Sequence, residues 1–244
     1  GISSRAILIG LICAALECLI APYNDYVIRN VFLAGGHFPV GPFFVFAILI
    51  LIGNSILKKI HPSAVLTASE LVTIWCIMAA ASGIPSTGMM RHALRPLVAY
   101  QYFATPENDW LALFHQYIPD WRVVRDVDAI KSFYEGISEG DQIPWEAWII
   151  PLGVWTIYVL VLYFVVICLS ALLRKQWVEI ERCTFPLIQL PVEMASHPFG
   201  SQKSFFKNKA LWIGFSIPVL IHTVNGLHAF FSYFPQFPVR YWLD

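Results

Sequence analysis

Charged residues are scarce in this chain of 244 residues. Lysine, arginine, aspartate and glutamate make up 13% of it, and the 16 basic residues balance the 16 acidic ones. A soluble domain carries roughly 25% charged residues, so the composition excludes an ordinary soluble protein. A net charge of zero also supplies no basic surface for nucleic acid. We therefore expect no nucleic-acid partner.

Motifs for catalysis and metal binding are also missing. The sequence contains no GxSxG, HExxH, Walker A or CxxC pattern. No pair of its five cysteines has the spacing of a metal site, and we interpret them as small core residues. We therefore expect no catalytic residues, no metal and no cofactor. No signal peptide with a cleavage site is recognisable either. Because the chain begins at GISSRA and stops at RYWLD, we expect it to be part of a longer polypeptide.

Apolar residues are abundant, at 57% of the chain, with a mean hydropathy of +0.62. A helix needs about 20 apolar residues to cross a bilayer, and five runs approach that length. These runs are 6–21, 43–57, 64–82, 147–173 and 210–231. They predict an all-α fold, a polytopic bundle of transmembrane helices whose first partner is the lipid bilayer. The run 6–21 is expected to end at Pro22, since proline does not continue a helix.

The basic residues predict the orientation of the chain in the membrane. Lys58 and Lys59 form a short basic turn after the second run, and such turns stay in the cytoplasm. This places the N-terminus in the cytoplasm, and the membrane is expected to be the inner (plasma) membrane of a bacterium. The chain then divides into three parts: three spans in 1–90, an extracytoplasmic loop in 91–146, and two spans with a cytoplasmic link in 147–244.

The loop 91–146 is expected to be ordered because it is rich in aromatic residues, which disordered segments lack. It carries five basic and nine acidic residues. Asp109 is predicted to cap a short helix that ends at Tyr117, and a second helix is expected over 128–134. The loop either lies on the membrane surface as a cap or stands clear of the lipid as a small domain.

Two acidic residues fall within the predicted spans. A charge in the middle of a bilayer costs about 2.5–3.5 kcal/mol, so Glu17 and Glu70 need a partner, a proton or water. Thr67 and Thr73 lie on the same helix face as Glu70. These four residues are candidates for a proton, ion or solute path. The alternative is that they only hold helices together.

A glycine- and proline-rich break follows the third run. Its candidate residues are Gly83, Pro85, Ser86, Thr87 and Gly88, whose backbone groups are available to a solute if the helix unwinds within the membrane. Arg91 and Arg95 come next, one helical turn apart, and arginine suits a carboxylate or a phosphate. The alternative is an ordinary helix end with anchoring arginines at the interface. Since 13 residues of helix measure about 20 Å, Glu70 and the break are expected to mark a path rather than a single site.

His222 and Asn225 form a third candidate pair, one helical turn apart in the last span. A histidine within a span is rare and is a functional candidate. The alternative is a hydrogen bond between helices.

Four stretches together resemble a known family. They are GGHFPVGPFF at 35–44, TASELVTIWCIMAAASGIPSTGMMRHALRPL at 67–97, TPENDW at 105–110 and RKQWVEIERCTFPLIQLP at 174–191. They resemble large bacterial polytopic membrane proteins known only as domains of unknown function. The organisation is also similar to that of oligopeptide-transporter proteins, although the signature motifs of those transporters are absent. The resemblance implies a longer parent protein and supplies no catalytic residues.

Three functions remain open at this point. The first hypothesis is transport of a small polar or peptide-like solute, with protons as the candidate coupling ion. The second is a membrane-embedded enzyme that acts on a lipid-linked substrate through His222, His228, His92 and an acidic residue. The third is a structural or assembly subunit that docks through its aromatic loop.

Overall fold

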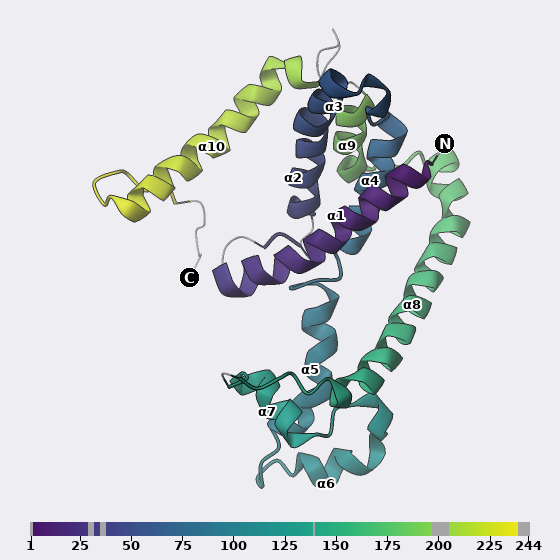
Figure 1. The fold of residues 1–244 in the computed structure, drawn as a ribbon, viewed down its shortest axis with the longest axis vertical. Coiled ribbons are helices and arrows are strands. Elements are labelled where there is room, and N and C mark those ends of the chain that lie inside the picture. Colours follow the sequence, from purple (N-terminus) through teal and green to yellow (C-terminus); the bar gives the residue numbers. More distant parts are fainter. Residues whose placement is uncertain (1, 29–31, 35–37, 139, 197–204, 239–244) are drawn as a thin grey trace.

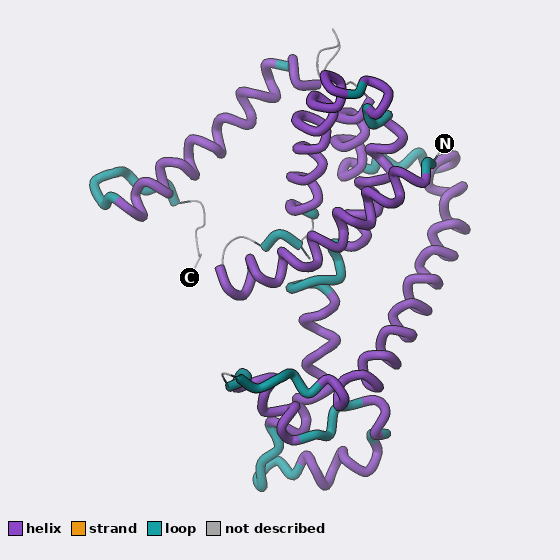
Figure 2. The backbone as a smooth tube through the Cα atoms, viewed as in Figure 1, coloured by secondary structure: helices purple, strands orange, loops and turns teal. Residues whose placement is uncertain are grey.

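Four helices of the computed structural model are long and apolar enough to cross a bilayer: Ser4–Ile28, Val40–Ile60, Trp145–Ile180 and Lys209–Phe230. The structure describes the chain except residues 1, 29–31, 35–37, 139, 197–204 and 239–244. The described residues form helices and loops and no strand (Figure 2). The predicted all-α membrane fold is therefore confirmed.

The third predicted span is shorter in the structure. Helix α4 covers Ala68–Ala81, and a 3-10 turn over Pro62–Ala64 precedes it. Its 14 residues measure about 21 Å, less than the roughly 30 Å of hydrocarbon in a bilayer. The helix starts late because the side chain of Thr67 caps it. The described residues thus form four helices that are long enough to span a bilayer and one shorter apolar helix, and the three-part division of the chain stays a prediction.

The first two spans contain π-helical turns. Helix α1 (Ser4–Pro22) does not end at Pro22 as predicted, but continues as a π-helical turn over Tyr23–Ile28. Proline lacks an N–H, and a wider turn is one way for a helix to continue past such a gap. The second span consists of α2 (Val40–Ile48), a π-helical turn (Leu49–Gly53) and α3 (Asn54–Ile60).

A small bundle forms the centre of the molecule. Helices α1, α2 and α4 pack together with α9 (Pro186–Ser196), which lies against α4 (Figure 1). Trp75 of α4 is at the centre of the apolar core, and its ring centroid lies 5.4 Å from that of Phe46 in α2. The core is completed mainly by Ile50, Leu71, Ile74, Met78 and Met194.

The closest helix pair in this bundle is α1 with α4. Ala6, Gly10 and Ala14 are buried on the face of α1 that meets α4. Small residues four positions apart allow two membrane helices to approach closely. At Gly10 an added Cβ atom would lie 2.8 Å from Cδ1 and 3.2 Å from Cβ of Ile77. The two helices therefore approach so closely at this position that little room is left for a side chain.

A helical cap lies at one end of the bundle. Helix α5 (Met89–Tyr102) leads out to α6 (Trp110–Phe114) and α7 (Val127–Glu135), and α8 (Trp145–Lys175) returns from the cap (Figure 1). The cap has a core of its own, made of Leu97, Val98, Val124, Ala129, Ile130 and Trp148.

Asp109 occupies the N-cap position of α6, as predicted, but its side chain does not cap the helix. Asp109 adopts a left-handed backbone conformation, with φ of 49°, and its side chain makes no capping bond. Instead, Oδ1 of Asn108 accepts hydrogen bonds from the N–H groups of Trp110 at 3.1 Å and Thr105 at 3.0 Å. The second predicted helix is present as α7, and Asp126 caps it by accepting a bond of 2.7 Å from the N–H of Ala129.

Two helices leave the bundle on different sides. Of the described side chains, α8 buries only Trp148 and Pro151, and α10 (Lys209–Phe230) buries none. In Figure 1, α8 runs along one side and α10 projects from the other. Their exposed surface is apolar, as expected for helices that lipid surrounds.

The close contact at Gly10 leads to a stability prediction. The substitution Gly10→Leu should destabilise the protein by about 1–3 kcal/mol because it forces α1 away from α4. Thermal unfolding in detergent micelles measures the effect. Gly153→Leu in α8 is the matched control, since an added Cβ there meets nothing within 4 Å. Equal melting temperatures for the two variants would contradict the close packing of α1 on α4.

Candidate functional site

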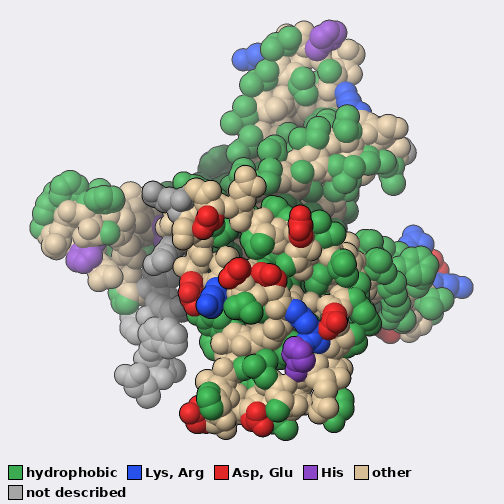
Figure 3. All heavy atoms as spheres, turned by 60° about the horizontal axis from the view of Figure 1, so that its bottom comes forward, with side chains coloured by type: hydrophobic (Ala, Val, Ile, Leu, Met, Phe, Trp, Pro, Cys, Tyr) green, Lys and Arg blue, Asp and Glu red, His purple; other side chains and the backbone are tan. Residues whose placement is uncertain are grey.

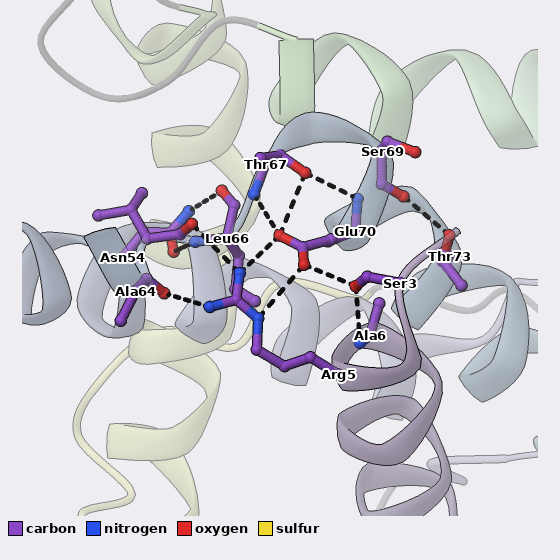
Figure 4. A network of polar contacts seen from close by, with 11 residues as sticks. Ser3, Arg5, Ala6, Asn54, Ala64, Leu66, Thr67, Ser69, Glu70 and Thr73 are labelled. Carbon is purple, nitrogen blue, oxygen red and sulfur yellow. Dashed lines mark hydrogen bonds and ion pairs between the residues drawn. The ribbon is translucent and has the colours of Figure 1, made fainter. Parts of the chain in front are cut away.

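Glu70 is held by a network that joins the starts of α1 and α4 (Figure 4). Nη2 of Arg5 lies 2.7 Å from Oε2 of Glu70, and Nε of Arg5 donates to Oε1 at 3.2 Å. The hydroxyl of Ser3 donates to Oε1 at 2.6 Å. The N–H of Thr67 donates to Oε2 at 2.9 Å, while its hydroxyl accepts from the N–H of Glu70 at 3.3 Å, which completes a capping box. The carboxylate therefore has a donor on each oxygen.

These contacts favour a structural role for Glu70. The hydrogen bonds from Arg5 and Ser3 lower the pKa of Glu70 to about 2, so it stays ionised near neutral pH. Thr67 caps the helix, and the hydroxyl of Thr73 donates to the carbonyl of Ser69 at 2.8 Å. A place for Glu70 and the two threonines in a solute or ion path stays a prediction.

A second network joins the other ends of α1 and α4. Asp25 is buried just after α1, and its carboxylate accepts a hydrogen bond from the hydroxyl of Ser86. The same carboxylate accepts a bond of 3.4 Å from the N–H of Leu33. The hydroxyl of Thr87 donates to the carbonyl of Ala34 at 2.8 Å. The break after α4 is therefore tied to the segment that follows α1.

The break itself is a closed turn. The N–H of Met89 donates to the carbonyl of Gly83 at 2.8 Å, and the N–H of Met90 donates to the carbonyl of Ile84 at 3.0 Å. A Cβ atom on Gly88 would collide with the carbonyl oxygen of Gly83, so the turn requires glycine there. These backbone groups serve the turn, whereas Pro85 and Ser86 line a cavity.

That cavity, of about 670 Å³, lies between the end of α1, the break, α5 and α7. Arg91 and Arg95 both line it, and neither forms an ion pair or a hydrogen bond with any described residue. Burial raises the pKa of the Tyr134 phenol, and the charge of Arg95 opposes that rise. The other lining residues are Cys18, Pro22, Tyr26, Ile84, Met90, Leu94 and Phe133. We call this space the cap-end cavity; its two free guanidinium groups suit a carboxylate or a phosphate.

Glu17 lies between the two networks on the buried face of α1. Its exposed fraction is 7%, and both carboxylate oxygens lack a hydrogen-bond partner among the described residues. Oε1 lies 3.5 Å from the position that a Cβ atom on Gly41 would take, at the start of α2. A buried carboxyl group without a donor needs a proton or a cation to balance its charge.

A second cavity, of about 710 Å³, lies at the opposite end of the bundle, near the start of α4. Lys58 and Thr67 are among its polar lining residues. Arg5 pairs with Glu70 near this end, and Asp25 bonds Ser86 near the other, so α1 and α4 run in the same direction between the two cavities. Glu17 occupies a position on α1 between these two ends.

The candidates of the last span do not join either cavity. Asn225 donates to the carbonyl of Phe237 at 2.8 Å and accepts from its N–H at 2.7 Å, so it holds the chain that follows α10. His222 is exposed on α10, whereas His92 lines a hollow between α5 and α8. Among the described residues, no three His, Cys, Asp or Glu side chains are placed to share a metal ion.

The sequence therefore led to Arg91, Arg95 and the break, which the structure places around one cavity. It did not lead to Tyr26 or Tyr134, because the π-helical turn after α1 and helix α7 come to this cavity only through the fold. Asp25 could have been found from spacing. It lies four and eight residues after Ala21 and Glu17, on the buried face of α1.

The fold and the two cavities define a helical membrane protein with buried polar groups between its apolar helices. The chain belongs to a family of unknown function, DUF6785, whose model matches residues 1–244. The predicted membership of an uncharacterised family is thus confirmed. No curated protein and no solved structure matches the chain.

The low pKa of Glu70 predicts how the Arg5–Glu70 pair depends on pH. Because the pKa is lower in the folded protein than in the unfolded chain, the pair stabilises the fold above about pH 4.5 and loses this effect as the pH falls toward 2. Glu70→Gln should cost about 1–2 kcal/mol at neutral pH. The difference in melting temperature from the wild type should stay constant from about pH 8 to pH 5 and shrink at lower pH.

Glu179→Gln, which changes an exposed carboxylate after α8, is the control and should leave the melting temperature unchanged. If the difference at Glu70 instead varied between about pH 6 and pH 8, Glu70 would exchange a proton near neutral pH and the structural role would be wrong.

Proposed function

We propose that this protein transports a solute with a carboxylate or phosphate group across the membrane. The observation that carries the proposal is the pair of arginines in the cap-end cavity, which pair with none of the described residues. Structural arginines near a membrane surface normally pair with an acid or a carbonyl group, as Arg5 does. Arg91 and Arg95 keep their hydrogen-bonding capacity free, and a bidentate anion would satisfy it.

The position of the cavity supports transport rather than simple binding. The break ends at the cavity, α1 runs from it toward the second cavity, and Glu17 lies along the way. We infer that the solute enters at the cap end and that Glu17 carries the coupling proton. In the orientation that Lys58 and Lys59 favour, the cap faces the outside of a bacterial inner membrane and the N-terminus faces the cytoplasm.

Removing both guanidinium groups tests the proposal. The protein in liposomes with an imposed pH gradient is offered three radiolabelled probes: dialanine, inorganic phosphate and octyl phosphate. The wild type should accumulate at least one of them. Arg91→Gln/Arg95→Gln should lower its uptake at low concentration at least tenfold, because two charged hydrogen bonds are lost. Lys131→Gln, a cap residue that does not line the cavity, is the matched control. Accumulation of none of the probes, or equal uptake by the double variant, would overturn the proposal.

Glu17 is tested by its own substitution. Glu17→Gln keeps the shape of the side chain but cannot exchange a proton, so the pH gradient should no longer drive accumulation. Downhill flux and binding of the probe at the cap end should persist, because Glu17 does not line the cavity. Uptake that responds to the pH gradient as in the wild type would remove Glu17 from the coupling.

A further inference from the structure

An apolar groove lies beside the cap-end cavity. It has a volume of about 480 Å³, and its walls come from α5, α7 and the start of α8. Met90, Leu94 and Phe133 line both spaces, so the groove begins where the cavity ends. On the far side, the groove is lined by Ile137, Ile143, Trp145, Trp148 and Leu152. A charged site and an apolar groove thus share one wall.

The cavity lies at the depth where lipid head groups are expected. The apolar run of α8 ends at Arg174, and about 20 residues toward the cap from there the helix reaches Val154. Trp155 and Tyr158 lie within about one helical turn of Val154, on its membrane side, as aromatic residues do at a membrane surface. The guanidinium of Arg122 in the cap lies 5.8 Å from the ring centroid of Trp155.

Helix α5 stands beside this part of α8. Met89 and His92 share a hollow with Trp155 and Tyr158, and Arg91 lies between them on the helix. The two arginines of the cavity are therefore near the surface of the bilayer.

The surface charge of the cap bears on the route of the ligand. Acidic side chains are spread over the face of the cap that Figure 3 presents. The exposed acids of the cap are Glu107, Asp109, Asp120, Asp126, Asp128, Glu135 and Asp141. A soluble anion that approaches from water meets like charge there. An anion that diffuses within the head-group layer reaches Arg91 and Arg95 from the side of the bundle.

We propose that the ligand of this site is a membrane-borne amphiphile with a phosphate or carboxylate head. Arg91 and Arg95 bind the head in the cap-end cavity, and the chain lies in the groove beyond Phe133. This proposal names the class of substrate for the proposed transport function. It rests on that function only in the claim that the bound ligand is then moved across the membrane. The binding step stands on the cavity and the groove alone.

Chain length is the variable that tests this proposal. The protein in nanodiscs of zwitterionic lipid is titrated with inorganic phosphate, butyl phosphate and octyl phosphate by calorimetry, with empty nanodiscs subtracted. Full burial of a methylene raises affinity about fourfold, so an open groove should raise it roughly twofold per methylene. Octyl phosphate should therefore bind most tightly and inorganic phosphate least.

Two variants separate the head from the chain. Arg91→Gln/Arg95→Gln should weaken all three probes at least tenfold. Ile137→Ser/Ile143→Ser should abolish the dependence on chain length and leave inorganic phosphate unchanged. Both isoleucines are more than 40% exposed, so this variant is expected to fold. Lys131→Gln should bind like the wild type. Equal affinity for the three phosphates, or a length dependence that survives the isoleucine changes, would overturn the proposal.

The outcome also distinguishes this inference from the transport function. If dialanine is taken up and chain length has no effect on the affinity for phosphates, the proposal of an amphiphilic ligand is wrong and the transport function stands. If octyl phosphate binds tightly but no probe is taken up, the binding site for an amphiphile stands and the transport function is wrong.

Discussion

The close packing of α1 on α4 is the contact on which the rest of this structure depends. Gly10 and its small neighbours allow the two helices to touch, and a polar clamp fixes each end of the pair. Arg5 and Glu70 form one clamp, while Asp25 and Ser86 form the other. In an apolar medium, such polar groups hold helices in register because their alternative is an unpaired dipole or charge.

The position of the candidate site follows from the second clamp. Because Asp25 holds the break against the end of α1, α5 leaves the bundle at a fixed point, with Arg91 and Arg95 beside the end of α1. The cap then brings Phe133 and Tyr134 over the same space. The site is thus built at the junction of three parts of the chain, and its two charges have no ion-pair partner among the residues that the structure describes.

Composition and spacing predicted part of this arrangement. Low charge and long apolar runs were sufficient to predict a helical membrane protein, since the bilayer imposes helix length and apolarity directly. The prediction that the break and the two arginines belong together rested on their closeness in sequence. The structure places both at one cavity.

The remaining features depend on contacts between distant residues. Glu70 looked like an acid within a span. The spacing of Thr67 and Glu70 is that of a capping box and could have predicted the helix start, whereas the pairing of Glu70 with Arg5, 65 positions away, cannot be read from spacing. Asp109 is the N-cap residue of α6, but Asn108 and not Asp109 accepts the hydrogen bond from Trp110, because the backbone of Asp109 is left-handed, which residue type alone does not determine. The groove beside the cavity exists only once α7 and α8 fold onto α5.

The central claim is that an anion enters the space between the arginines and the groove from the cap side of the membrane. Met90 lines both the cavity and the groove and is 38% exposed. A cysteine at this position therefore reports on access to both spaces. The decisive measurement is the labelling rate of Met90→Cys, in a protein without its native cysteines, by a membrane-impermeant maleimide on sealed vesicles. The account predicts labelling from the cap side that octyl phosphate slows at least tenfold. Labelling only from the opposite side, or a rate that octyl phosphate leaves unchanged, would contradict it.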